Sequence, residues 1–231
     1  ILTSRYKNNK VNLKNLIYFL SKIFFQEVFL VNRLKKFNNN ESIHQTEMMF
    51  QLINKCNISY DKNIEIEKYI PNKNVIKSKK KICLLHLSSK WINKYYSEIN
   101  FIKLIEIINK KFTIILTSDH STKQKFKLIY DKYTIYKNNT FNQIKEISEI
   151  TILDELNFEN WIQSIYSAQL IITPECGCTH IATICKVNSK IIYDADNMPN
   201  MINAEYAPWR SNYEKYIFDS KNLNDLLTKN L

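Results

Sequence analysis

Arginine is scarce in this chain of 231 residues. It occurs only at Arg5, Arg33 and Arg210, so the formal charge of +11 comes almost entirely from lysine. Arginine is the residue that best reads bases and phosphates through paired hydrogen bonds. We therefore interpret the charge as a general lysine bias and predict no nucleic-acid partner. The alternative, a basic nucleic-acid binder, predicts binding that falls steeply with salt.

A long apolar run and a dense set of cysteines are also missing. The most apolar stretch, residues 16–31, is interrupted by Lys22, Gln26 and Glu27, which makes it too polar for a membrane span. Five cysteines without a secretory signal do not form a disulfide scaffold. The sequence therefore predicts a protein of the reducing cytoplasm. A basic surface of this kind favours anionic partners, such as nucleotides or the cytoplasmic face of an acidic membrane.

The chain does have enough apolar residues for a core. Its hydrophobic fraction of 45% predicts a globular protein rather than a disordered one. From Lys81 onward, short β-branched runs alternate with amphipathic segments, as in stacked βα units. The predicted strands are 82–86, 112–117, 151–153, 170–173 and 190–193, and the predicted helices are 98–110, 121–131, 158–168, 178–186 and 222–229. This α/β alternation predicts a Rossmann-like parallel sheet with helices on both faces, which binds ligands at the carboxyl ends of its strands.

The residues before this domain have a different character. We predict a helical segment and linker over residues 1–78, and the Rossmann-like domain over residues 79–231. Apolar residues recur at helical spacing over 11–37, and a second helix is predicted over 42–56. We interpret the first as a helix packed on the domain rather than one lying on a membrane surface. Because the first residue is Ile rather than Met, we expect a piece of a longer protein.

The single glycine, Gly177, lies between an apolar strand and the next helix. Glycine permits a positive φ or close approach of a ligand, and the first N–H groups of the helix would point at that ligand. A tight turn without a ligand fits equally well, so both interpretations stay open. Cys176, Cys178 and His180 are suited to zinc, but a second ligand pair is missing, so we predict no metal. A cysteine nucleophile is less expected still, because no histidine lies in a recognisable partner motif.

Three stretches around this glycine resemble the donor-binding domain of glycosyltransferase family 9, which includes the lipopolysaccharide heptosyltransferases. They are residues 154–161, residues 168–173 and the run Glu-Cys-Gly-Cys-Thr-His-Ile-Ala that begins at Glu175. The family pattern has an acidic residue, a hydroxyl residue, Gly, two variable residues and His. Gly177 and His180 match it, whereas Glu175 replaces Asp and Cys176 replaces Ser or Thr. The resemblance implies that the donor diphosphate and sugar face Glu175, Cys176, Gly177, Cys178, Thr179 and His180.

A separate match lies upstream. Residues 82–89 resemble the family's strand that ends in His-Pro-Gly-Ala-Ser, and residues 94–96 resemble its Lys-Arg-Trp-Pro segment. The resemblance places Ser88, Ser89 and Lys94 at the diphosphate, where a lysine would neutralise the pyrophosphate that leaves. In the loops after the strands, it implies nucleoside contacts at Ser118, Asp119 and Leu153. Residues 44–52 and 205–209 extend the similarity over most of residues 40–218.

The resemblance implies the C-terminal half of a GT-B fold, in which two Rossmann-like domains face each other across a cleft. It also implies transfer of a sugar from a nucleoside diphosphate sugar to a lipopolysaccharide-type, other glycan or lipid-linked saccharide acceptor, without a cofactor or metal. Nothing before residue 40 resembles the sheet of an acceptor domain, so we assign no catalytic base. Residues 1–78 are interpreted as a remnant of, or a connection to, an N-terminal acceptor domain. The implied location is cytoplasmic, with peripheral contact at the cytoplasmic face of the inner membrane. The alternative is a truncated or degenerate non-catalytic module that binds a nucleotide sugar or another anion.

Overall fold

The computed structural model describes residues 20–24, 34–36, 41–61, 75–118, 122–194, 204–209, 211 and 213–218. The chain forms two compact units. The smaller consists of residues 1–64 with 200–207, and the larger of residues 65–199 with 208–231. The interpretation of residues 1–78 as a remnant of, or a connection to, an acceptor domain stays a prediction, as does the boundary at residue 79.

In the smaller unit, residues 20–24 are helical. Strand β1 (Leu34–Lys36) pairs antiparallel with β2 (Glu41–Ser42), and α2 (Gln45–Lys55) follows. The helix predicted over 42–56 is therefore confirmed as α2. The helix predicted over 11–37 is wrong at residues 34–36, which form strand β1. The apolar residues at helical spacing end at Val31, so no helical pattern covers these three residues. The rest of that range, apart from residues 20–24, lies outside the described residues.

His44 connects the start of α2 to a distant segment of the same unit. Its Nδ1 accepts a hydrogen bond from the Thr46 N–H at 3.0 Å. The proton therefore lies on Nε2, which donates to the Ala207 carbonyl at 2.7 Å. This bond joins two of the segments that resemble family 9, residues 44–52 and 205–209.

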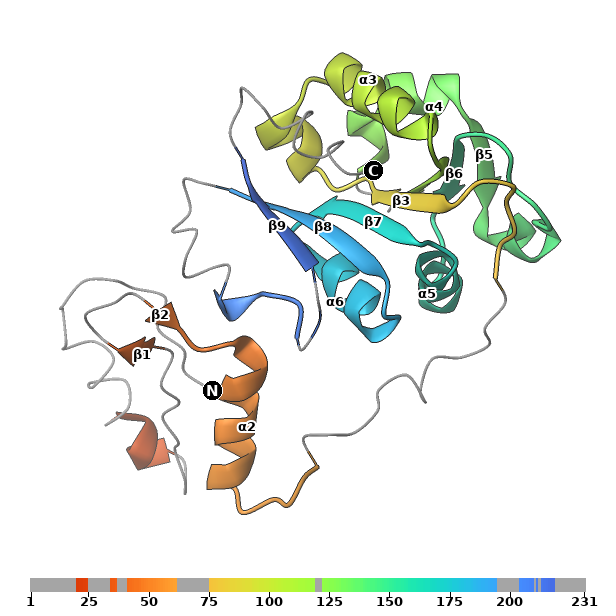
Figure 1. Ribbon diagram of the computed structural model, residues 1–231. Coiled ribbons are helices and arrows are strands. Elements are labelled where there is room, and N and C mark those ends of the chain that lie inside the picture. Colours follow the sequence, from red (N-terminus) through yellow and green to blue (C-terminus); the bar gives the residue numbers. More distant parts are fainter. Residues whose placement is uncertain are drawn as a thin grey trace. The chain divides into compact units, whose positions relative to one another are not determined.

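The larger unit is a seven-stranded sheet in the order β5-β6-β4-β3-β7-β8-β9, with every pair parallel (Figure 1). The strands are β3 (Ile82–His86), β4 (Thr113–Ser118), β5 (Thr134–Lys137), β6 (Thr151–Asp154), β7 (Leu170–Pro174), β8 (Asn188–Tyr193) and β9 (Tyr213–Ile217). The predicted Rossmann-like class is thus confirmed. Strands β5 and β9 were not predicted, because these edge strands are mostly exposed and lack an apolar run.

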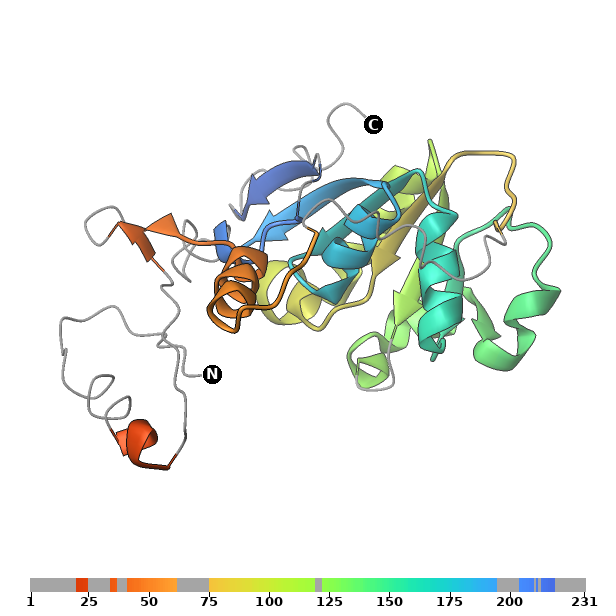
Figure 2. The ribbon, with the colours of Figure 1, turned by 90° about the horizontal axis from the view of Figure 1, so that it is seen from below.

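Helices cover both faces of this sheet (Figures 1 and 2). On one face lie α3 (Glu98–Asn109) and α4 (Lys127–Lys132), and on the other lie α5 (Phe158–Tyr166) and α6 (Gly177–Ile184). The buried strands are apolar on both sides, as a doubly covered parallel sheet requires. In β3, Cys83 and Leu85 pack in the α3 core, whereas Leu84 packs in the α5–α6 core.

Two predicted helices need comment. The helix predicted over 121–131 is instead a 3₁₀ turn, η3 (Lys123–Lys125), followed by α4. The break occurs at Phe126, which is buried and leaves the helical conformation with φ −124° and ψ 40°. The helix predicted over 222–229 lies outside the described residues.

Helix α6 ends in a Schellman motif that carries lysine where glycine is favoured. The Val187 N–H donates to the Ala182 carbonyl at 3.0 Å, and the Lys186 N–H donates to the Thr183 carbonyl at 3.1 Å. Lys186 has a φ of 55°, in the left-handed region that disfavours residues with a Cβ atom.

We therefore expect Lys186→Gly to stabilise the protein by about 0.5–1 kcal/mol, because glycine adopts this φ without the Cβ penalty. The thermal midpoint should rise by about 1–4 °C for a chain of this size. Lys186→Ala is the matched control: it removes the same charge and keeps the strain. An equal rise in both variants would attribute the gain to charge instead.

Candidate functional site

The strand order changes direction at β3. Strands β4, β6 and β5 lie on one side of it, and β7, β8 and β9 lie on the other. Ligands of such sheets bind in the crevice at the carboxyl ends of the strands that flank this reversal. Here His86 ends β3 and Pro174 ends β7. The predicted donor residues, Ser88–Ser89 and Glu175–His180, follow these two strands and so lie at the same edge of the sheet.

A short helical turn, η2 (Trp91–Tyr95), follows β3 and is firmly anchored. Trp91 is fully buried, its Nε1 donates to the His86 carbonyl at 2.8 Å, and its ring stacks on Phe101 with centroids 4.6 Å apart. The Lys90 N–H donates to Ser88 Oγ at 3.3 Å. Two lysines, Lys90 and Lys94, are thus carried on a turn whose backbone is fixed by packing.

Lys90 is the lysine that reaches the Gly177 turn. Its Nζ lies 2.6 Å from Glu175 Oε2 and also donates to the Glu175 carbonyl. The contact joins the loop after β3 to the loop after β7, across the reversal point. Lys90 was not predicted as a site residue, because it lies four residues before Lys94 in no recognisable motif.

Lys94, the lysine that the sequence analysis selected, forms an ion pair with Asp194, immediately after β8. Since β8 lies next to β7, the Lys94–Asp194 pair is also at the carboxyl ends of the strands, one strand further from β3 than the Lys90–Glu175 pair. The structure therefore brings Lys90 to Glu175 and Lys94 to Asp194. Both lysines are neutralised by carboxylates that a bound diphosphate would have to replace.

Gly177 begins α6, but not for the conformational reason considered above. Its φ is not positive, and a Cβ atom built on it would meet nothing within 4 Å. Open space at the start of an eight-residue helix is compatible with a ligand close to the backbone. Thr179 donates to the Cys176 carbonyl through its Oγ1 at 2.7 Å and through its N–H at 3.1 Å, and the N-cap residue Cys176 makes no side-chain capping bond. His180 lies in this first turn and is half-buried.

The cysteines of the turn are set up as neutral thiols. Burial raises the pKa of Cys176 and raises that of Cys178 well above its ordinary value. A thiol with a raised pKa is a poor nucleophile and a poor zinc ligand. Among the residues that the structure describes, no group of three or more His, Cys, Asp and Glu side chains is placed to hold a metal ion.

The predicted nucleoside residues are less available. Leu153 is fully buried in the α5–α6 core, so only its main chain faces the strand end. Ser118 is 8% exposed, and its hydroxyl bonds to Tyr130 and, at 3.0 Å, to Asp154 Oδ1. Asp119 lies outside the described residues.

Asp154, at the end of β6, is a buried carboxylate that the sequence analysis did not single out. It is fully buried and accepts hydrogen bonds from Tyr130 Oη at 2.6 Å and Lys123 Nζ at 3.1 Å, in addition to Ser118. Burial alone would raise the pKa of Asp154, but these three donors lower it below its ordinary value. The network fixes the carboxyl ends of β4 and β6 together.

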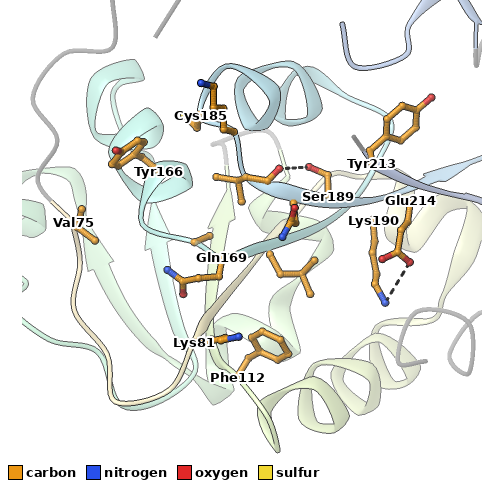
Figure 3. Close-up of a pocket in the computed structure, with 15 residues that line it drawn as sticks. Val75, Lys81, Phe112, Tyr166, Gln169, Cys185, Ser189, Lys190, Tyr213 and Glu214 are labelled. Carbon is orange, nitrogen blue, oxygen red and sulfur yellow. Dashed lines mark hydrogen bonds and ion pairs between the residues drawn. The ribbon is translucent and has the colours of Figure 1, made fainter. Parts of the chain in front are cut away.

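A cavity of about 1030 Å³ lies at the amino ends of the strands, opposite to the carboxyl ends described above (Figure 3). Its lining includes the first residues of β7, β8 and β9 and contains none of the predicted donor residues. Figure 3 shows Lys190 beside Glu214, with a dashed line for their ion pair. Lys190 is buried, and its Nζ lies 3.8 Å from Glu214 Oε2. Burial lowers the pKa of Lys190, and the charge of Glu214 opposes that effect. This cavity therefore lies at the other end of the strands from the loops that follow β3 and β7.

The comparison with protein families decides the identity. The model of glycosyltransferase family 9 (heptosyltransferase) matches residues 28–219, which is most of the chain. The chain belongs to glycosyltransferase family 9. The resemblance found in the sequence is thereby confirmed. A comparison with curated protein sequences found no match.

Solved structures of the family share the fold at low sequence identity. A family 9 glycosyltransferase from Veillonella parvula DSM 2008 aligns with a TM-score of 0.57 and 11% identity, over 92% of this chain and 58% of its own. The E. coli heptosyltransferase WaaC with ADP aligns with a TM-score of 0.60 and 10% identity, over 90% of this chain and 59% of its own. WaaC with ADP-2-deoxy-2-fluoro heptose gives 0.58 and 11%, with 90% and 59% covered. This family 9 chain therefore spans less than two thirds of the length of these relatives.

No helix among the described residues is long and apolar enough to cross a membrane. The short helical segment at residues 20–24 exposes Ile23 and Phe24, by 65% and 79%.

Proposed function

We propose that this chain is the donor-binding part of a glycosyltransferase. It binds a nucleoside diphosphate sugar at the carboxyl ends of β3 and β7, between the loop at Ser88–Lys94 and the turn at Glu175–His180, which we call the crevice. The observation that supports this most is the pairing of two anchored lysines, Lys90 and Lys94, with carboxylates along one strand edge, beside the uncapped start of α6. Cations beside the N–H groups of a helix start suit a diphosphate.

The chemistry follows from that placement. In the transfer, the bond from the sugar's anomeric carbon to the diphosphate oxygen breaks, and a bond to the acceptor oxygen forms. The electron pair leaves with the diphosphate, and the acceptor hydroxyl gives its proton to a base. Lys90, Lys94 and the first amides of α6 would stabilise the negative charge on the departing group. The base is unassigned, and the proposal requires neither a metal nor a cofactor for charge stabilisation.

Membership of family 9 and the ADP-bound relatives support an ADP- or UDP-type donor and a lipopolysaccharide-type or other glycan acceptor. A heptose or hexose is the proposed sugar. The proposed location is the cytoplasm, with peripheral contact at the inner membrane supported by the lysine-rich composition and by the exposed Ile23 and Phe24.

The proposal predicts that calorimetry detects binding of ADP, UDP or their sugars, and that mass spectrometry finds a nucleotide that co-purifies. Lys94→Ala should weaken this binding at least about fivefold, because it removes a charge-assisted contact to the diphosphate. An unchanged affinity in Lys94→Ala would remove Lys94 from the site. No binding of any of these nucleotides to the unaltered chain would overturn the proposed function.

A second candidate function is a non-catalytic module that binds the same donor. The replacements at Glu175 and Cys176 favour it, because they alter the sugar-facing end of the turn. The two functions differ in one measurement: release of the nucleoside diphosphate from the donor in the presence of an acceptor. Binding of the donor without release of the nucleoside diphosphate would favour the non-catalytic module.

A further inference from the structure

Lysines gather at the amino ends of the strands, opposite to the crevice. Because the seven strands are parallel, the residues that precede them meet at one end of the sheet. Exposed lysines precede β3, β4 and β8, and we call them together the basic surface: Lys77, Lys79, Lys80, Lys81, Lys110, Lys111 and Lys186. Carboxylates are fewer there, since Glu146 and Glu149 precede β6 and Glu214 lies in β9.

The segment that carries four of these lysines, residues 76–81, is fixed across the amino ends of the strands. Its hydrogen bonds join it to the end of α5, to the loop before β6 and to the start of β4: Ile76 N–H to Ser167 Oγ, Ile147 N–H to the Lys77 carbonyl, and Thr113 N–H to the Lys81 carbonyl, each at 2.9 Å. The lysine side chains therefore extend from an ordered backbone, and a partner does not have to order it on binding.

Helix ends explain only part of this basic surface. The helices end at the same side of the sheet, where cations stabilise their last carbonyls. That accounts for Lys110, which follows α3, and for Lys80, whose Nζ donates to the Asn109 carbonyl at 3.1 Å. It does not account for Lys79 and Lys81, which are exposed in a segment that is not helical.

The other end of the strands has a different balance of charge. Three lysines there form ion pairs with carboxylates at or after the strand ends: Lys90 with Glu175, Lys94 with Asp194, and Lys123 with Asp154. A general lysine bias would not by itself place the positive excess at one end of the sheet. The basic surface is therefore a local feature that attracts an anionic partner.

The cavity of about 1030 Å³ adjoins the basic surface and shares Lys81 and Lys186 with it. Three lysines but a single carboxylate, Glu214, line this cavity, and apolar side chains such as Phe112 lie between the polar ones. Figure 3 shows Lys81 and Cys185, the neighbour of Lys186, at opposite ends of the lining. A small anion would contact one of these lysines, whereas an extended ligand can contact both.

We propose that the basic surface and this cavity bind an acidic, extended segment of a partner protein. Its carboxylates pair with the lysines, and its apolar side chains enter the cavity. A membrane fits less well, and this choice rests on the proposed function: a membrane at the amino ends would keep a lipid-linked acceptor away from the crevice at the carboxyl ends. Nucleic-acid binders favour arginine, whereas the basic surface consists of lysines.

The test is fluorescence anisotropy with a labelled peptide of about twelve residues in which glutamate and leucine alternate, at about 0.15 M salt. The unaltered protein should bind it with a Kd of about 10–100 μM. The triple variant Lys79→Glu, Lys81→Glu and Lys110→Glu should bind it at least about tenfold more weakly, because it reverses three charges of the basic surface. If this variant does not fold, Lys79→Gln with Lys81→Gln replaces it, with a loss of about threefold expected.

A matched control makes the same change of net charge elsewhere. Lys103→Glu, Lys127→Glu and Lys137→Glu alter exposed residues of α3, α4 and β5, and this variant should keep the peptide affinity of the unaltered chain. Saturating ADP or UDP should not displace the peptide, so the result does not depend on whether the crevice binds a sugar nucleotide.

Four outcomes overturn the proposal. The first is that the peptide does not bind, and the second is that the control variant loses as much affinity as the variant of the basic surface. The third is displacement of the peptide by a nucleotide, which would place it in the crevice. The fourth is tighter binding of phosphatidylglycerol vesicles or duplex DNA than of the peptide, lost in the variant of the basic surface, which would assign the lysines to a membrane or a nucleic acid.

Discussion

Replacing both crevice lysines, Lys90→Met with Lys94→Met, should reduce the affinity for a nucleoside diphosphate by about 100-fold or more. Each lysine would make a hydrogen bond to a charged phosphate oxygen, and such bonds contribute about 1.5–3 kcal/mol each. Methionine keeps most of the side-chain length and packing while removing the charge. Calorimetric titration with ADP and UDP measures the effect.

The carboxylates that hold these lysines provide a variant of opposite sign. Glu175→Gln removes the charge that lies 2.6 Å from Lys90 Nζ, so the positive charge of Lys90 is no longer neutralised and only its bond to the Glu175 carbonyl competes with the diphosphate. We expect free ADP or UDP to bind severalfold more tightly to Glu175→Gln, with a steeper loss of affinity as salt is added. A nucleotide sugar need not follow this trend if Glu175 also accepts hydrogen bonds from the sugar.

A matched control removes a lysine elsewhere. Lys132 lies on α4, is half-exposed and pairs with Glu106 at 2.5 Å, so Lys132→Met takes away an ion-paired charge without touching the crevice. It should bind nucleotide as the unaltered chain does. If the Lys90–Lys94 double variant retains normal affinity, or if Lys132→Met weakens binding equally, the nucleotide is held elsewhere or by net charge alone.

The architecture could be predicted because buried strands that alternate with amphipathic helices bury their apolar faces in a parallel sheet with helices on both sides. The edge strands β5 and β9 could not be predicted in this way, because few of their side chains are buried and the apolar pattern is therefore absent. The helix predicted over 121–131 failed at Phe126, whose burial outweighed local helical spacing.

The candidate site could be predicted only where residues close together in the sequence match the family pattern. The run around Gly177 and the segment at Ser88–Lys94 carry the family pattern. The pairing of Lys90 with Glu175 joins residues 85 positions apart, and it depends on which strand lies beside β3. Nothing in the sequence fixes that neighbour. The buried network around Asp154 could not be predicted for a different reason. A carboxylate that follows a strand in the sequence is typical of an exposed loop, and only the structure shows that Asp154 is buried.

Asp154→Ala should destabilise the protein by about 2–4 kcal/mol, since it breaks a buried charged network. The fully buried carboxylate accepts from Ser118 Oγ, Tyr130 Oη and Lys123 Nζ at 3.0, 2.6 and 3.1 Å. Lys123, 41% exposed, can return to water, whereas the Ser118 and Tyr130 hydroxyls lose a buried acceptor. Urea unfolding should show a lower midpoint with an unchanged slope.

The pH dependence gives a second measure of the same network. The hydrogen bonds from Tyr130, Lys123 and Ser118 lower the pKa of Asp154 despite its burial. A carboxyl whose pKa is lowered by folding contributes stability above its unfolded pKa of about 3.9, and that contribution is lost as the pH falls through the folded value. Stability should therefore decline below about pH 4 more steeply in the unaltered chain than in Asp154→Asn. Asp131→Asn, which changes an exposed residue of α4, is the matched control and should keep the steep decline. Equal acid sensitivity of Asp154→Asn and the unaltered chain would mean that Asp154 does not hold the ends of β4 and β6 through its charge.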